Sequence, residues 1–190
     1  MKYGDVVRSH PFWRNLDARH FGVLIEWADV VHFGFGQPIF QAGATAEQFY
    51  LIHSGRVGLE MFVRGKGIVT IQTIDAGEAL GWSWFFPPYR WHFDARSHLV
   101  TDALVFSAQT LRSYAEKDHD FGYELATRVA QVMLQRLQAT RLKLLDFYAA
   151  IKDPDSGSDG SVSRANHRLS HDIWTSRRPR VTARYRETRY

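Results

Sequence analysis

The 190-residue sequence contains no cysteine. Disulfide frameworks, thiolate metal sites, iron–sulfur clusters and cysteine nucleophiles are therefore excluded. No apolar run approaches the ~20 residues that a membrane-spanning helix needs. Residues 1–13 also lack the continuous apolar stretch of a secretory signal. We therefore expect a soluble, cytoplasmic protein that makes no contact with a membrane.

The sequence patterns that accompany common enzyme chemistries are missing as well. No G-x-S-x-G, Walker or Rossmann pattern occurs. The 9 histidines are dispersed, and the single His-x-Asp pair, His92 with Asp94, has no further ligand at metal-binding spacing. We therefore predict no catalytic residues, no metal site and no enzyme activity.

The positive charge is confined to one end of the chain. The net charge is +4, yet residues 1–150 hold 15 Lys and Arg against 15 Asp and Glu. Residues 151–190 hold the other 9 Lys and Arg against 5 Asp and Glu. The body of the protein is therefore not a basic surface of the kind that binds nucleic acid. We expect residues 152–190, rich in Ser, Gly and Arg, to be a disordered basic tail.

Aromatic residues are concentrated in one short segment, residues 77–96. Seven of them fall between Trp82 and Phe93, together with a central arginine, Arg90. Glycines precede this cluster, and glycine lets a backbone approach a ligand closely. An arginine fork suits phosphate or carboxylate, and aromatic faces stack on planar ligands. The alternative is a hydrophobic cluster beneath a loop.

The order of elements predicts a helix, then a β-roll, then helices. Apolar spacing predicts a helix within residues 10–29, with Asp17 as its N-cap. A short helix capped by Thr110 is expected over residues 110–116, and a long helix over residues 118–150. Between them, seven short apolar runs separated by turn residues predict a β-sandwich or barrel. These runs are residues 30–35, 38–41, 49–54, 56–63, 68–74, 91–96 and 103–108.

The long helix would extend for about 45 Å, which is more than a small β-roll can cover. We therefore favour a seam that meets a second copy of the chain, over a helix that lies wholly across its own domain. Arg128 and Arg136 are expected away from the apolar face. The resulting organisation is a β-roll with N-terminal helices at residues 1–116, a dimerisation helix at 117–151 and the tail. The expected interface residues are Leu125, Val132, Met133, Leu137 and Leu144.

Three segments of the chain resemble the cyclic nucleotide-binding domain of catabolite-activator-type (Crp/Fnr) regulators. Residues 40–43 (FQAG) and 49–57 (FYLIHSGRV) are similar to the family's hairpin region. Residues 77–81 (GEALG) are similar to the start of its phosphate-binding cassette. The resemblance covers about residues 10–150. It implies an α+β fold, a double-stranded β-helix (jelly roll) with an N-terminal helix and a long C-terminal dimerisation helix.

The resemblance also implies a ligand site in the cassette. Gly81 matches the second cassette glycine, and Arg90 is the best match for the arginine that holds the cyclic phosphate. Trp82 stands where the family has the glutamate that binds the ribose 2′-hydroxyl, and an indole offers no acceptor for that group. Glu78 is nearby, at a position that does not face the ribose in the family. The predicted ligand-binding residues are Gly77, Glu78, Gly81, Trp82, Ser83, Arg90 and Trp91.

Three occupants of the cassette remain open from the sequence. The site holds a cyclic nucleotide in a modified way, or Arg90 and the tryptophans Trp82, Trp84 and Trp91 hold another small anionic ligand. Alternatively the tryptophans fill the cavity and the chain is a structural dimerisation module. A cupin-type enzyme is the least favoured alternative, and no cofactor is certain.

The expected function is therefore that of a stand-alone regulator in signal transduction. It would act through ligand-biased contacts within a homodimer or with a partner protein. Residues 152–190 lack the two helical patterns of a helix-turn-helix, so we expect no sequence-specific DNA binding.

Overall fold

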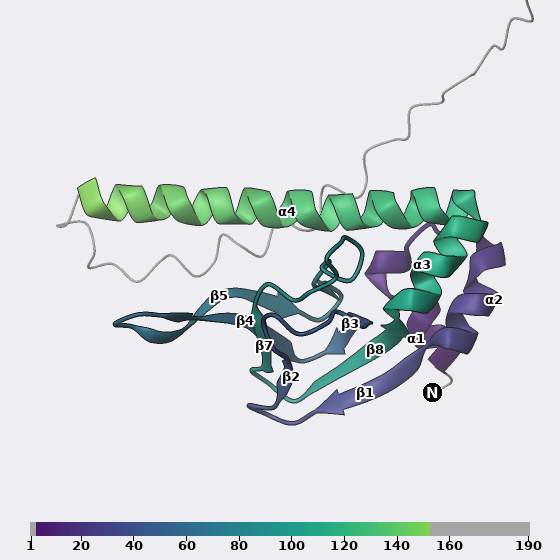
Figure 1. Cartoon of the computed structure of the whole chain (residues 1–190), viewed down its shortest axis with the longest axis horizontal. Helices are drawn as coiled ribbons and strands as arrows, with labels where there is room; N and C mark the ends of the chain where they lie inside the picture. The colour runs from purple at the N-terminus through teal and green to yellow at the C-terminus, as the bar shows by residue number, and fades with distance from the viewer. Residues whose placement is uncertain (1–2, 153–190) are drawn as a thin grey trace, which may run out of the picture. The chain divides into compact units, whose positions relative to one another are not determined.

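The computed structural model describes residues 3–152, and the residues up to Thr140 form one compact unit. In Figure 1 the helices α1, α2 and α3 lie together at one end of the strands β1 and β8. The helical elements are α1 (Tyr3–Ser9), the 3-10 helix η1 (Pro11–Trp13), α2 (Ala18–Trp27), α3 (Ala108–Lys117) and α4 (His119–Lys152). The strands are β1 (Asp29–Phe33), β2 (Pro38–Phe40), β3 (Gln48–Ser54), β4 (Arg56–Val63), β5 (Gly67–Asp75), β6 (Ala79–Leu80), β7 (Asp94–Ser97) and β8 (Thr101–Ser107).

The strands form two antiparallel four-stranded sheets. Their orders are β1-β8-β3-β6 and β2-β7-β4-β5, so chain neighbours alternate between the sheets as in a jelly roll, except for the hairpin β4–β5. The predicted α+β class, with N-terminal helices and a long C-terminal helix, is confirmed. The strand expected at residues 91–96 begins later, at Asp94. The two-residue strand β6 was not predicted, because it is too short to show an alternating pattern.

Two apolar clusters hold the compact unit together. The first lies between the sheets, where Ile52, Val57 and Ile74 are completely buried, as expected for the facing sides of a sandwich. The second joins the helices to the sheet that contains β3 and β8. In that cluster the Trp13 ring stacks on Phe121 with ring centroids 6.4 Å apart, and the ring centroids of Phe49 and Trp84 are 4.6 Å apart. The N-terminal helices and α4 therefore share one core.

The helix caps follow local hydrogen bonding. Asp17 caps α2 as predicted, because its Oδ1 accepts a hydrogen bond from the Arg19 N–H at 3.0 Å. The predicted cap Thr110 was wrong. The helix α3 begins at Ala108, and Ser107 is its cap, with its Oγ accepting from the Thr110 N–H at 3.3 Å.

The first half of α4 belongs to the domain core rather than to a free surface. Phe121 and Leu125 are fully buried and Val129 is 3 % exposed. Leu125 therefore differs from its prediction as an interface residue, because its side chain is not available to a partner helix. Arg128 is also buried, and donates from Nε to the Phe12 carbonyl at 2.9 Å. Because of these contacts the compact unit extends past residue 116, as far as Thr140.

The prediction of a disordered tail concerns residues that lie outside those described, apart from Lys152. Within residues 3–152, no helix has the length and hydropathy needed to cross a membrane.

Candidate functional site

The cassette runs from β6 to β7, and its entry is fixed by hydrogen bonds to β3. The Gly77 N–H donates to the Ile52 carbonyl at 2.7 Å, and the Ile52 N–H donates to the Glu78 carbonyl at 2.9 Å. Strand β6 then pairs with β3 through Leu51 and Ala79. The segment that carries the predicted ligand residues is thereby held against one sheet.

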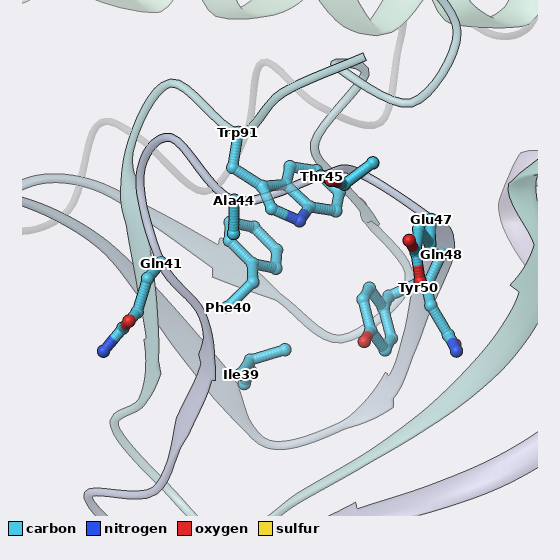
Figure 2. Close-up of a pocket in the computed structure, with 9 residues that line it drawn as sticks. All are labelled: Ile39, Phe40, Gln41, Ala44, Thr45, Glu47, Gln48, Tyr50 and Trp91. Atoms are coloured by element: carbon cyan, nitrogen blue, oxygen red, sulfur yellow. The ribbon is translucent and has the colours of Figure 1, made fainter.

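Trp91 occupies the space beside the second cassette glycine. Gly81 has a φ of +76°, and a Cβ placed on it would lie 2.7 Å from Cζ3 of Trp91. Figure 2 shows the indole of Trp91 lying against the Phe40 ring. Their ring centroids are 3.8 Å apart and their planes are 6° apart, which is a stacked contact. Only 5 % of Trp91 is exposed. The cassette is therefore closed on this side by its own aromatic residues.

A surface hollow lies next to this stack. It has a volume of about 350 Å³, with Phe40, Tyr50 and Trp91 as its aromatic lining. Figure 2 shows Glu47 and Gln48 on the same side of the hollow as Tyr50, and Gln41 pointing away from it. The stack thus separates this hollow from Gly81.

Arg90 contacts the backbone of the preceding hairpin rather than a ligand cradle. Arg90 is exposed, and its backbone forms an isolated β-bridge with Thr45. Its Nη1 donates to the Gly43 carbonyl at 2.7 Å. The guanidinium predicted to hold an anion therefore acts in this structure as a clamp on the loop before β3.

A different arginine, Arg136 of α4, reaches the cassette. The guanidinium carbon lies 5.1 Å from the centroid of the Trp82 ring, and Nη2 donates to the Ala79 carbonyl. Only 6 % of Arg136 is exposed. Its Nη1 is buried and makes no hydrogen bond within the described part of the chain. Burial lowers the pKa of Arg136 to about 10, while the charge of Glu78 acts in the opposite direction.

The sequence reasoning missed Arg136 because it placed the residue on the polar side of the helix. A signal was nevertheless present. Val129, Val132 and Arg136 follow at i, i+3 and i+7, so the arginine belongs to the apolar stripe. Val132 is half-buried against the core, as this spacing requires.

Glu78 supports the turn that precedes the cassette. Its Oε2 accepts a hydrogen bond from the Asp75 N–H at 2.6 Å. Glu78 is exposed as a residue, but desolvation of its carboxylate by neighbouring atoms raises its pKa, against the opposing effects of this hydrogen bond and of the Arg136 charge. The carboxylate is therefore already engaged by the backbone.

The remaining cassette residues do not form the aromatic-walled anion site considered above. Ser83 is bonded through Oγ to Nδ1 of His92 at 2.9 Å. Trp84 is fully buried against Phe49, and its carbonyl accepts from Arg112. Of the predicted site residues, the structure brings Gly81 to Trp91 and brings Glu78 and Trp82 to Arg136. Throughout residues 3–152, no group of three or more His, Asp or Glu side chains is arranged to hold a metal ion.

Comparisons with known proteins bear on the family and the fold of the chain. Residues 30–118 match the cyclic nucleotide-binding domain family. No curated protein matches the chain.

Solved structures share the fold at low sequence identity. A cyclic nucleotide-binding domain from Methylobacillus flagellatus superposes with a TM-score of 0.66 and 19% identity, over 76% of this chain and 84% of its own. The catabolite activator protein of Thermus thermophilus gives 0.57 and 22%, over 77% and 72%. The regulatory domain of Toxoplasma gondii PKA, solved with cAMP, gives 0.56 and 14%, over 72% and 49%. The cyclic nucleotide-binding domain match of residues 30–118 and the fold shared with these structures therefore point to the same kind of domain.

Proposed function

We propose that this chain contains a regulatory domain in which the cassette biases the long helix α4, and α4 transmits that bias through contacts with a second copy. The observation that carries the proposal is the burial of Arg136 in the cassette. A side chain of α4 is hydrogen-bonded to the Ala79 carbonyl and lies over Trp82. Any change in the cassette that moves these groups must therefore alter the packing of α4.

The exposed apolar residues of α4 supply the surface for that second copy. Met133, Leu137 and Leu144 are 36%, 48% and 52% exposed. Their spacing of four and seven residues places them on one stripe of the helix. Monomers rarely expose an apolar stripe of this kind, and an isologous helix pair would remove it from water.

Binding of a cyclic nucleotide in the ordinary manner is not part of the proposal. Trp82 provides no acceptor for a ribose hydroxyl. Trp91 lies against Gly81, where a ligand would have to approach the backbone. The Nη1 group of Arg90 is engaged by the Gly43 carbonyl. An occupant of the ordinary kind would therefore have to displace Trp91 and would find no acceptor at position 82.

The proposal is of a regulator and not of an enzyme or a reader of DNA. The polar groups of the cassette are engaged in support of the fold, Glu78 on the Asp75 N–H and Ser83 with His92. In the described part of the chain, α3 and α4 are the helices that follow the last strand. Leu111 and Phe121 anchor them in the core, so neither is presented as a recognition helix.

A second candidate function is a structural dimerisation module that binds no ligand. The stack of Trp91 on Phe40 favours it, because two large rings in parallel contact fill the space beside Gly81. In this case the cassette would fix α4 permanently in its dimer-forming position.

Sedimentation equilibrium tests the link between cassette and dimer. The wild-type chain should dimerise, and Arg136→Gln should change the dimer dissociation constant by at least about tenfold, because one charged hydrogen bond to the cassette is lost. The control is Arg141→Gln, which removes an exposed charge one turn further along α4. If both variants dimerise as the wild type does, the cassette does not control α4 and the proposal fails.

A further inference from the structure

We propose that Arg136 is the receptor for a small oxyanion, a carboxylate or phosphate group, which binds at its unpaired Nη1 beside the Trp82 ring. The inference rests on the proposed regulatory function and names the chemistry of the occupant. It moves the anion site from Arg90, where the family pattern places it, to a residue of α4.

The first observation is an unsatisfied donor. A guanidinium carries five N–H groups. Nη2 of Arg136 donates to the Ala79 carbonyl, while Nη1 is buried and has no partner among the described residues. Buried N–H groups almost always find an acceptor, so one without a protein partner is a position where an oxygen atom of a ligand or of water can bind.

The second observation is an uncompensated charge. The carboxylate whose charge acts on Arg136 is that of Glu78, and it accepts its hydrogen bond from the Asp75 N–H and not from Arg136. Burial of a guanidinium without a hydrogen-bonded counter-ion is costly. An anion that reached Nη1 would supply both the missing acceptor and the missing charge.

Arg128, on the same helix, shows what a satisfied arginine looks like in this protein. It is as deeply buried as Arg136, at 6 % exposed. Its Nη1 is paired with the Glu124 carboxylate, and Nη2 donates to the Arg14 carbonyl at 3.0 Å. The lack of a counter-ion is thus specific to Arg136 and does not reflect how the chain treats buried arginines in general.

The shape of the surroundings restricts the ligand. The guanidinium fork matches the paired oxygens of a carboxylate or phosphate. The Trp82 ring, 5.1 Å from the guanidinium carbon, adds a flat apolar surface that favours a planar group attached to the anion. Trp82 is therefore a specificity residue, because the glutamate that the family has at this position would neutralise Arg136.

Thermal unfolding at constant ionic strength tests the site, with inorganic phosphate and benzoate as probes and chloride as the reference ion. The wild-type melting temperature should rise with phosphate, benzoate or both, and calorimetry should give a saturable isotherm. Trp82→Glu places a carboxylate beside the guanidinium and should weaken anion binding by at least about tenfold, because it occupies the fork internally. Arg141→Gln should bind as the wild type does.

Arg136→Gln removes the proposed anion receptor directly. If that variant does not fold, Trp82→Glu remains informative, because the Trp82→Glu chain keeps Arg136. Glu78→Gln should bind the probes at least as tightly as the wild type, since it removes a competing negative charge. No saturable effect of either probe on the wild type would overturn the inference, as would unchanged binding in Trp82→Glu. The dimer measurement is made without any probe, so failure here and failure of the regulatory function are distinguishable.

Discussion

Replacement of Gly81 by alanine measures how tightly Trp91 closes the cassette. The new Cβ would lie 2.7 Å from Cζ3 of Trp91, closer than carbon atoms approach without a shift of one of them. The indole has little room to move, because it is stacked on Phe40 at 3.8 Å. Overpacking of this kind costs about 1–3 kcal/mol. The φ of +76° adds about 1–2 kcal/mol for a residue with a Cβ.

Gly43 provides the matched control for this prediction. Its φ is +82°, nearly that of Gly81, but no atom lies within 4 Å of an added Cβ. Gly43→Ala should therefore lower the free energy of unfolding only by the cost of the positive φ, about 1–2 kcal/mol. Gly81→Ala should lose about 3 kcal/mol in total, which corresponds to a melting temperature roughly 6–12 °C lower.

Urea unfolding followed by far-UV circular dichroism gives both free energies. The double variant Gly81→Ala/Trp91→Phe should recover much of the steric share, because phenylalanine lacks the second ring that bears the contact atom. Equal losses for Gly81→Ala and Gly43→Ala would refute the reasoning, since they would mean that Trp91 does not lie against Gly81.

Three further predictions follow from other parts of the molecule. Burial lowers the pKa of His10 to about 4, from 6.5, so the unfolded chain binds the proton more readily than the folded one. The free energy of unfolding should therefore fall by up to about 3 kcal/mol as the pH drops from 6.5 to 4. His10→Asn should flatten this pH dependence, measured by urea titrations at several pH values. Met133→Glu/Leu137→Glu should give a monomer in light scattering, because a dimer would have to desolvate like charges, and a persistent dimer would exclude this stripe as the interface. Asp17→Ala should cost about 0.5–2 kcal/mol of unfolding free energy, because α2 loses the acceptor for its Arg19 N–H, whereas Asp17→Asn should cost far less.

Most of the fold was predictable because it depends on local patterns. The β-strands appear as short apolar runs between turn residues, and the strand Arg56–Val63 was predicted with its exact bounds. The cap of α2 was found for the same reason, since Asp17 directly precedes the apolar spacing. Ser107 was missed because two hydroxyl residues, Ser107 and Thr110, compete for the cap within four positions, and only the backbone path decides between them.

The site was predictable only in part because it depends on contacts across the chain. The residue type at position 82 predicted an altered cassette. The pairing of Trp82 with Arg136 joins residues that lie far apart in sequence, and helical spacing alone does not distinguish a buried arginine from an exposed one. Similarly, Arg90 was assigned by its place in a motif, whereas its partner, the Gly43 carbonyl, is fixed by the path of the hairpin.

The hydrogen bonds from Arg128 to the N-terminal loop set an order of events during synthesis of the chain. The carbonyls of Phe12 and Arg14 precede their donor by 116 and 114 residues. At a translation rate of about 5–20 residues per second, these carbonyls are synthesised about 6–23 seconds before Arg128. The buried ring of Trp13 likewise completes its packing only after Phe121 has been synthesised. Nascent chains that end before residue 121 should therefore leave one face of the Trp13 ring uncovered, although Phe49 and Phe106 are already present to pack on it.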